Sequence, residues 1–325
     1  MKAASTFKGS PCKAGLAGAL ATVLVVAPAL AQQDERPIKL ATDLVMVNAT
    51  VTDKDGTFIR DLKTDDFVIY EDGEARKIDF FEATEEAALT CPLAVVVAID
   101  TSGSIRQEEI SRQREATENF VKLVRPESLF AIIAFSSETR VLQDFTSDAR
   151  KISQAFQRLG EVGGSSRIFG SIDRAISMLK RAPRFRNGRR LRRVVIVLTD
   201  GYDNVSPPDQ SEMIRRANDA EVTVYSITLP SYIAGVGANQ RAMTLLDVSQ
   251  VVPRTGGKDF SADKDLTPMF KAIAEEIRST YTIAYYPPEK FRRDGRLHQV
   301  RIECKRSGAI VRASRNTYEA PRQAS

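Results

Sequence analysis

Three short polar segments hold the residues of this chain whose types and spacing could do chemistry. Asp100, Ser102 and Ser104 follow a continuously apolar run, and their alternate spacing lets one carboxylate and two hydroxyls turn toward a common point. Asp200 follows a second apolar run, and residues 163–166, Gly-Gly-Ser-Ser, lie between the two. Oxygen donors with few formal charges suit hard cations such as Mg²⁺, Mn²⁺ or Ca²⁺. The pattern therefore predicts a divalent-cation site.

Buried strands must position these segments. Apolar runs are typical of strands covered on both faces in a parallel sheet, and they occupy residues 93–99, 130–135, 194–198 and 222–227. Helical periodicity lies between or after them, at residues 110–124, 172–179 and 269–277. The alternation predicts an α/β fold with a doubly wound, mostly parallel sheet. Ligands bind beyond the carboxyl ends of such strands, so the three polar segments should share one edge.

The flanks of this region are β-rich. A first strand is expected from the alternation at Leu44 and Met46 or Val47, continuing through Ala49 and Val51. Further strands are expected near residues 67–70 and 78–81. After residue 279, strands are expected at residues 281–286, 298–304 and 309–313, the last two as a hairpin across residues 306–308. We expect the two flanks to form one small β-sheet or sandwich into which the α/β domain is inserted. The predicted bounds are 38–88 for the first flank, 91–279 for the α/β domain and 281–318 for the second flank.

The beginning of the chain is typical of an export signal. Lys2, Lys8 and Lys13 precede an apolar stretch over residues 14–27, and Ala29-Leu30-Ala31 follow it with small residues at the positions that a signal peptidase reads. We predict a signal peptide over residues 1–31 and a periplasmic or secreted protein, with an uncleaved anchor as the alternative. In an exported protein, Cys91 and Cys304 could form a disulfide, and two separate thiols are the alternative.

Charge and composition narrow the class of partner. The 325 residues carry 47 Lys and Arg against 42 Asp and Glu, a balance too mild to indicate nucleic-acid binding. The densest basic cluster runs from Lys180 to Arg193. A solvated loop is its ordinary interpretation, and a patch for an anionic surface polymer or lipid is the other.

The polar segments resemble the metal-ion-dependent adhesion site of the von Willebrand factor A family. The family's Asp-x-Ser-x-Ser motif matches Asp100, Ser102 and Ser104, and its last Asp matches Asp200. Its Thr loop falls on residues 164–166, where a serine replaces the threonine. The following residues favour Ser166 over Ser165 as the ligand, without settling the choice. The resemblance covers roughly residues 92–279, and the flanks are similar to a group of exported bacterial A-domain proteins best known from acidobacteria.

The resemblance implies a protein that binds another protein and is not an enzyme. A Mg²⁺, Mn²⁺ or Ca²⁺ ion would bridge to an acidic side chain of the partner. Three alternatives remain: a metal-dependent hydrolase or phosphatase-like enzyme, a metal-free interaction scaffold, and a structural role in which Asp100 and Ser102 only cap a helix. Ser102 stands where aspartyl-phosphate phosphatases need a second Asp, and the single histidine, His298, is expected on a surface strand far from this edge.

Overall fold

A computed structural model of the chain describes residues 44–83, 92–160, 162–200, 209–229, 250–261 and 265–322. All of these residues belong to one compact unit, residues 42–325. The predicted signal peptide and Cys91 lie outside the described residues, so the predicted export and disulfide stay predictions. Cys304 is partly buried at the end of a strand.

A six-stranded sheet forms the centre of the α/β part. Its strands are β5 (Leu93–Asp100), β6 (Leu129–Phe135), β7 (Thr139–Thr146), β10 (Arg192–Thr199), β11 (Val222–Thr228) and β12 (Asp259–Ser261). Their order is β12-β11-β10-β5-β6-β7, and every neighbouring pair is parallel except β6 and β7. The side chains of β5 are buried along its whole length. The predicted doubly wound, mostly parallel sheet is confirmed.

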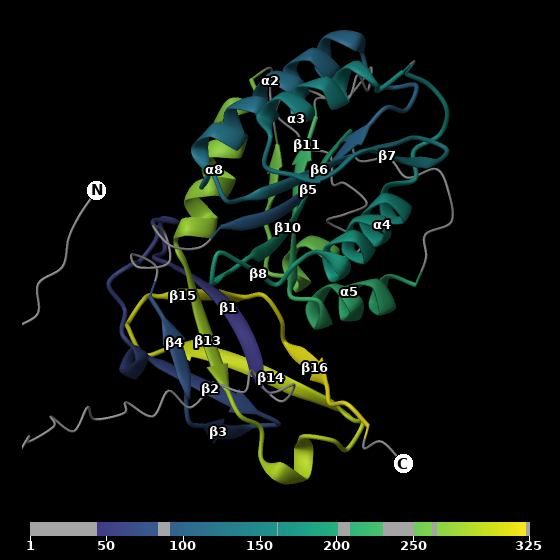
Figure 1. Ribbon diagram of the computed structural model, residues 1–325. Coiled ribbons are helices and arrows are strands. Elements are labelled where there is room, and N and C mark those ends of the chain that lie inside the picture. The colour runs from purple at the N-terminus through teal and green to yellow at the C-terminus, as the bar shows by residue number, and fades with distance from the viewer. Residues whose placement is uncertain are drawn as a thin grey trace, which may run out of the picture. The chain divides into compact units, whose positions relative to one another are not determined.

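Helices cover both faces of this sheet (Figure 1). One face packs against α2 (Gln107–Leu123), α3 (Ala149–Gln157) and α8 (Thr267–Arg278), and the other against α4 (Ile168–Arg181), α5 (Gln210–Asp219) and α7 (Val251–Arg254). The periodicity at residues 110–124, 172–179 and 269–277 correctly predicted α2, α4 and α8. A small hairpin, β8 (Phe185–Arg186) and β9 (Arg189–Arg190), leads from α4 into β10.

The flanks form a β-sandwich of two antiparallel sheets. One sheet has the order β15-β1-β13-β4 and the other β16-β14-β2-β3. Their strands are β1 (Val45–Thr52), β2 (Phe67–Glu71), β3 (Glu74–Arg76), β4 (Phe80–Glu82), β13 (Thr280–Tyr285), β14 (Leu297–Cys304), β15 (Ile310–Ala313) and β16 (Thr317–Glu319), with short 3-10 turns at Thr64–Asp66 and Glu289–Phe291. Val47, Ile69, Tyr281 and Tyr285 pack in the shared core.

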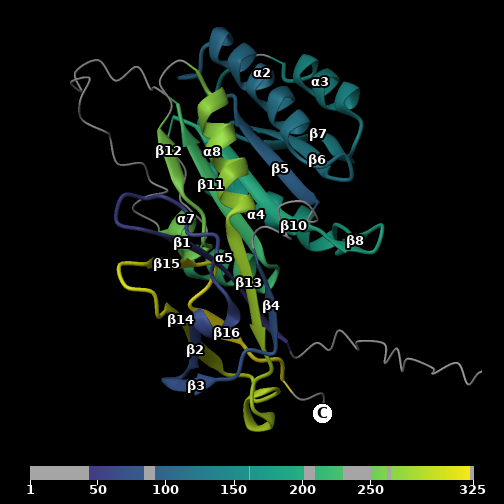
Figure 2. The same ribbon diagram turned by 90° about the vertical axis from the view of Figure 1, so that its left-hand side faces the viewer.

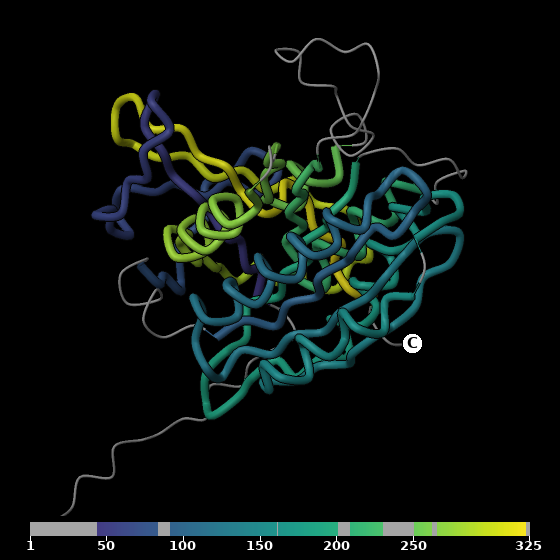
Figure 3. The backbone as a smooth tube through the Cα atoms, turned by 90° about the horizontal axis from the view of Figure 1, so that it is seen from above, coloured from purple at the N-terminus to yellow at the C-terminus, as the bar shows by residue number. Residues whose placement is uncertain are grey.

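The sandwich joins segments from far apart in the sequence, as expected for an inserted α/β domain. β1 pairs with β13 on one side and with β15 on the other. Figures 1 and 3 show the purple N-terminal strand beside the yellow and green C-terminal ones.

Three details of the sandwich correct the sequence analysis. The buried face of β1 carries Val45, Val47, Ala49 and Val51, while Met46 points the other way. Because strand faces alternate, the prediction was right for Val47, Ala49 and Val51 and wrong for Leu44 and Met46. β14 and β15 do not form a hairpin, because β14 pairs with β2 and β16 in one sheet and β15 pairs with β1 in the other. His298 is buried, not on the surface.

The environment of His298 explains its burial. Its ring stacks on Tyr318, with ring centroids 5.1 Å apart, and its Nδ1 and Nε2 lie 2.7 Å and 3.2 Å from carboxylate oxygens of Asp72 and Asp294. Burial alone would lower the pKa of His298, but the hydrogen bonds to the two carboxylates outweigh it, and the pKa is raised from 6.5. A charged imidazole with both nitrogens satisfied can therefore sit inside the sandwich.

Candidate metal centre

The carboxyl ends of two adjacent parallel strands position the site. β5 ends at Asp100, and β10 ends at Thr199 with Asp200 directly after it. The two strands are in register, with Leu198 opposite Ile99. Their last residues are therefore neighbours at one edge of the sheet, as the sequence predicted.

Asp100 connects all three polar segments. Its side chain is fully buried, and its Oδ1 accepts a hydrogen bond of 2.8 Å from the backbone N–H of Ser102. Its Oδ2 accepts hydrogen bonds from the hydroxyls of Thr199 at 2.7 Å and Ser166 at 3.0 Å. Burial raises the pKa of Asp100, the hydrogen bonds from Ser102 and Thr199 oppose that rise, and the charge of Asp200 adds to it.

The serines take different positions around this carboxylate. The hydroxyls of Ser102 and Ser104 lie 3.2 Å apart, the first buried and the second exposed. Ser166 is buried against Asp100. The contact of Ser165 is made by its backbone, whose N–H donates to the hydroxyl of Ser137. The structure thus brings Ser166, and not Ser165, to the carboxylate.

Backbone contacts hold the loops together. The N–H of Gly103 donates to the carbonyl of Gly164 at 3.1 Å, and the N–H of Gly163 donates to the carbonyl of Thr101 at 2.8 Å. Gly164 has a φ of +84°, and a Cβ at this position would lie 2.6 Å from the hydroxyl of Ser137. The glycine at position 164 therefore suits both the positive φ and the close approach of Ser137 to this segment.

Asp200 supplies a second carboxylate. It is 5% exposed, and its Oδ1 is buried with no hydrogen-bond partner among the described residues. Buried carboxylate oxygens are rarely left unsatisfied, so this atom is suited to accept a cation or a hydrogen-bond donor. No group of three or more His, Cys, Asp or Glu side chains that could hold a metal is found among the described residues. Any cation here would bind through hydroxyls and two carboxylates, a donor set that fits Mg²⁺, Mn²⁺ or Ca²⁺.

The helix-capping alternative for Asp100 and Ser102 is wrong. Helix α2 begins at Gln107 and its N-cap is Arg106, whose backbone N–H is bonded by the side chain of Glu109 at 2.7 Å. Asp100 and Ser102 lie before that cap and bond each other and the neighbouring loops.

Sequence reasoning missed two residues that shape the site. Thr199 holds Asp100 from the neighbouring strand, and Ser137 holds the segment around Gly164 and Ser165. Thr199 could have been found, because a hydroxyl residue that ends a strand directly before a candidate ligand lies at the same edge. Ser137 gave no such signal, since it comes from a connection to the antiparallel edge strand β7.

Comparison with known proteins identifies the fold family. Residues 95–202 match the family model of the von Willebrand factor type A domain, a stretch that runs from β5 to just beyond Asp200. The resemblance to the von Willebrand factor A family seen in the sequence is therefore confirmed over residues 95–202. No curated protein matches the chain in a sequence comparison.

Several solved structures are similar to this chain. The von Willebrand factor type A protein from Catenulispora acidiphila is 14% identical, with 86% of this chain and 74% of that chain covered at a TM-score of 0.47. An aerotolerance-related membrane protein from Bacteroides fragilis is 17% identical over 57% of this chain and 98% of its own, at 0.44. Proximal thread matrix protein 1 from the mussel byssus, with a zinc-occupied MIDAS motif, is 16% identical over 57% of this chain and 48% of its own, at 0.47.

Proposed function

We propose that this A domain binds a divalent cation at Asp100, Ser102, Ser104, Ser166 and Asp200, and that the cation holds a partner protein. The observation that carries the proposal is the buried Oδ1 of Asp200, which has no hydrogen-bond partner beside a second buried carboxylate. Two adjacent buried carboxylates repel each other, and a cation between them would relieve that repulsion and satisfy the free oxygen.

The donor set leaves room for a ligand from outside. Three of the five proposed ligands are neutral hydroxyls, so a divalent cation would keep a strong attraction for further negative charge. Ser104 is exposed, which gives the site an open side toward solvent. An Asp or Glu side chain of a partner protein would supply both charge and a ligand. Binding of this kind makes and breaks no covalent bond.

The competing function is metal-assisted hydrolysis, as a hydrolase or a phosphatase-like enzyme. That chemistry requires a base or acid near the cation. The single histidine of the chain, His298, is buried in the sandwich between Asp72 and Asp294, and Ser102 stands where a second catalytic Asp would be needed. These two observations favour binding over catalysis.

We also propose that the protein acts in the periplasm or outside the cell. The support is the basic and apolar sequence before Ala31, which is typical of an export signal. Within the described part of the chain, no helix has the length and apolarity that crossing a bilayer requires. N-terminal sequencing of the protein from its native cells tests the proposal: a chain that begins at Gln32 is expected, and one that retains Met1 would contradict it.

Calorimetric titration with Mg²⁺ and Mn²⁺ tests the metal centre. Wild-type protein should bind one of the cations, and Asp100→Ala should not. Because Asp100 also accepts hydrogen bonds from Thr199 and Ser166, its loss could disturb the loops. Asp200→Asn is therefore the sharper variant, since it keeps the shape of a side chain that receives no bond at Oδ1. Equal heats for wild type and Asp200→Asn, or no binding by wild type, would leave the domain a metal-free scaffold.

Affinity capture with and without a chelator tests the partner. We expect a protein that is captured by wild type, released by chelator and not retained by Asp200→Asn. Addition of free acetate at high concentration should compete, because it offers the same carboxylate to the cation. Turnover of a phosphate or carboxylate ester that depends on the same cation would instead support the enzyme.

A further inference from the structure

The hairpin formed by β8 and β9 projects from the α/β part of the molecule. Figure 2 shows β8 extending away from the central sheet. Its turn consists of Asn187 and Gly188, both with positive φ, at 51° and 73°. Two such residues make the tight turn whose twist matches that of a two-stranded ribbon. The hairpin is therefore a rigid projection rather than a loose loop.

The surrounding sequence is strongly basic. No acidic residue occurs between Asp173 and Asp200, whereas Lys and Arg are frequent there. Some of these cations stabilise the fold. Arg190 bonds Glu221, and Arg193 is buried and donates to the carbonyls of Ala220 and Ala182. These two arginines are not available to a partner.

Other cations are exposed on this hairpin or just before it, together with an aromatic ring. We call these residues the hairpin patch, and they are Lys180, Arg181, Arg184, Phe185 and Arg189. Phe185 pairs with Arg190, and Arg189 with Arg186, so Phe185 and Arg189 lie on opposite faces of the projecting ribbon. All five side chains are exposed, and no ion pair of the four basic ones is found in the described parts of the chain. Two nearby acids, Glu127 and Glu221, already pair with Arg125 and Arg190. The patch therefore keeps its positive charge.

Phe185 distinguishes between the two kinds of anionic partner. Its side chain is 43% exposed on the projecting hairpin. A water-soluble polyanion would pair with the cations and leave the ring in water. A lipid interface takes both, because phosphate headgroups bind the cations while the aromatic ring enters the boundary between headgroups and acyl chains. We propose that the hairpin patch docks this protein on an anionic lipid surface.

The position of the patch relative to the metal centre agrees with such docking. β10 begins beside the hairpin at Arg192 and ends at Thr199, next to Asp200. Eight residues of strand span about 26 Å. The hairpin and the metal centre therefore lie at opposite ends of β10. Lipid docking itself requires no cation at the metal centre, so a chelator should leave it unchanged.

Vesicle co-sedimentation tests the charge of the patch. Wild-type protein should bind phosphatidylcholine vesicles that contain phosphatidylglycerol, and not vesicles of phosphatidylcholine alone. Arg184→Gln/Arg189→Gln should weaken this binding roughly 30-fold, since each basic residue near an anionic membrane contributes about 1 kcal/mol. Arg114→Gln/Arg293→Gln removes the same charge from two exposed positions elsewhere and should have little effect. Equal losses of vesicle binding in the two double variants would show that binding depends only on the net charge of the protein. That result would overturn the proposal.

The aromatic ring gives the decisive measurement. The chain contains no tryptophan, so Phe185→Trp places a single fluorophore at the proposed contact. Its emission should shift to shorter wavelength when phosphatidylglycerol vesicles are added. Phe80→Trp is the matched control, because Phe80 is 44% exposed on β4 in the sandwich, and its emission should not shift.

Two results would overturn lipid docking. The first is an unshifted Phe185→Trp emission in a protein that still sediments with the vesicles. The second is Phe185→Ser binding that equals wild type, together with equal competition by a soluble anionic polysaccharide. Either would assign the patch to polyanions in solution.

Discussion

The two ends of the central sheet are built from different side chains. At the carboxyl ends of β5 and β10 lie two buried carboxylates, and the side-chain hydroxyls of Ser166 and Thr199 donate to that of Asp100. Oδ1 of Asp200 has no hydrogen-bond partner among the described residues. At the amino ends, Arg192 and Arg193 each donate hydrogen bonds from both terminal guanidinium nitrogens to backbone carbonyls. Satisfied donors hold parts of a protein together, whereas an unsatisfied buried acceptor is suited to a ligand from outside. The carboxyl ends of the strands are thus suited to binding a ligand, and the amino ends to holding parts of the protein together.

Arg192 illustrates the cohesive end. It donates to the carbonyls of Ile277 at 2.8 Å and Thr280 at 3.0 Å, where α8 passes into β13. It also donates to the hydroxyl of Thr282 at 3.0 Å. One side chain therefore fastens the A domain to the first strand of the returning flank.

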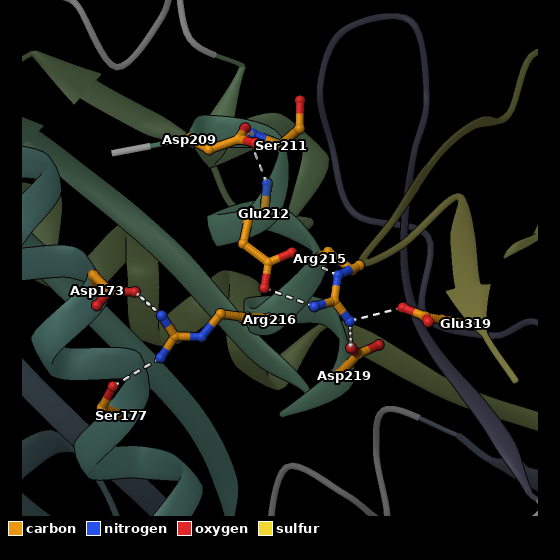
Figure 4. Close-up of polar contacts among 9 residues, drawn as sticks. All are labelled: Asp173, Ser177, Asp209, Ser211, Glu212, Arg215, Arg216, Asp219 and Glu319. Carbon is orange, nitrogen blue, oxygen red and sulfur yellow. Dashed lines mark hydrogen bonds and ion pairs between the residues drawn. The ribbon is translucent and has the colours of Figure 1, made fainter. Parts of the chain in front are cut away.

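Helix α5 adds a second connection (Figure 4). Arg215 bonds Glu212 at 2.6 Å on the helix itself and Glu319 of β16 at 2.8 Å. The next residue, Arg216, bonds Asp173 and Ser177 of α4. Two neighbouring arginines thus join one helix of the A domain to another and to the sandwich.

The largest expected effect concerns Arg192. Arg192→Leu should lower the free energy of unfolding by about 3 kcal/mol, because it removes three hydrogen bonds and leaves two buried carbonyls unsatisfied. Cation affinity should stay within about twofold, since the metal centre is at the other end of the sheet. Urea unfolding and calorimetry measure the two quantities. Arg114→Leu, at an exposed position, serves as the control. A large change in the cation affinity of Arg192→Leu would show that the two ends of the sheet are energetically coupled.

The next effect concerns the loop glycines. Gly164→Ala should destabilise the protein by about 2 kcal/mol and weaken cation binding, because it adds a Cβ at a positive φ and against Ser137. Gly163→Ala is a close control, since a Cβ there meets nothing within 4 Å. Thermal unfolding and Mg²⁺ titration of both variants measure the difference. Similar behaviour of the two would show that close packing of these loops does not matter.

A smaller effect separates the two adjacent serines. Ser166→Ala should weaken cation binding about 10-fold, the loss of one ligand or its partner hydrogen bond. Ser165→Ala should leave the cation affinity unchanged, since the contact of Ser165 with Ser137 is made by its backbone N–H, which the alanine keeps. Titration under identical conditions compares them. A greater loss of cation affinity in Ser165→Ala than in Ser166→Ala would assign Ser165, and not Ser166, as the ligand.

The smallest effect lies in the sandwich and depends on pH. The raised pKa of His298 means that folding stabilises its charged form, so this contribution is fully present below about pH 6.5 and is lost as pH rises through the folded-state pKa. We expect wild type to lose more stability than His298→Gln as the pH rises across that interval. Unfolding by urea at a series of pH values measures it. If the free energy of unfolding depends on pH in the same way in both proteins, His298 is not the cause of that dependence.

The sequence predicted the central sheet well because its signals are local. Runs such as residues 93–99 are too apolar to be anything but buried, and a strand end brings its polar residues to a known edge. The same logic predicted Asp100, Ser102 and Asp200 at one edge of the sheet. The preference for Ser166 over Ser165 came instead from the resemblance of residues 168–172 to the von Willebrand factor A family.

The features that the sequence left unresolved depend on distant partners. His298 lies in a strand with exposed neighbours, and only the positions of Asp72 and Asp294 explain its burial. The assignment of β14 and β15 to different sheets rests on their pairing with β2 and β1, which no local pattern encodes. Runs of arginine predicted a solvated loop, yet Arg193 is buried because carbonyls of other elements face it.

The place of β1 between β13 and β15 has a consequence for the time course of folding. The hydroxyls of Thr50 and Thr280 meet across a separation of 230 residues. At about 5–20 residues per second, synthesis of the intervening chain takes on the order of 10–50 s. During that interval β1 is an apolar strand with two open edges, which is prone to aggregate. Prior folding of the A domain shortens the effective loop between the two flanks, and so it should set the rate at which the sandwich closes.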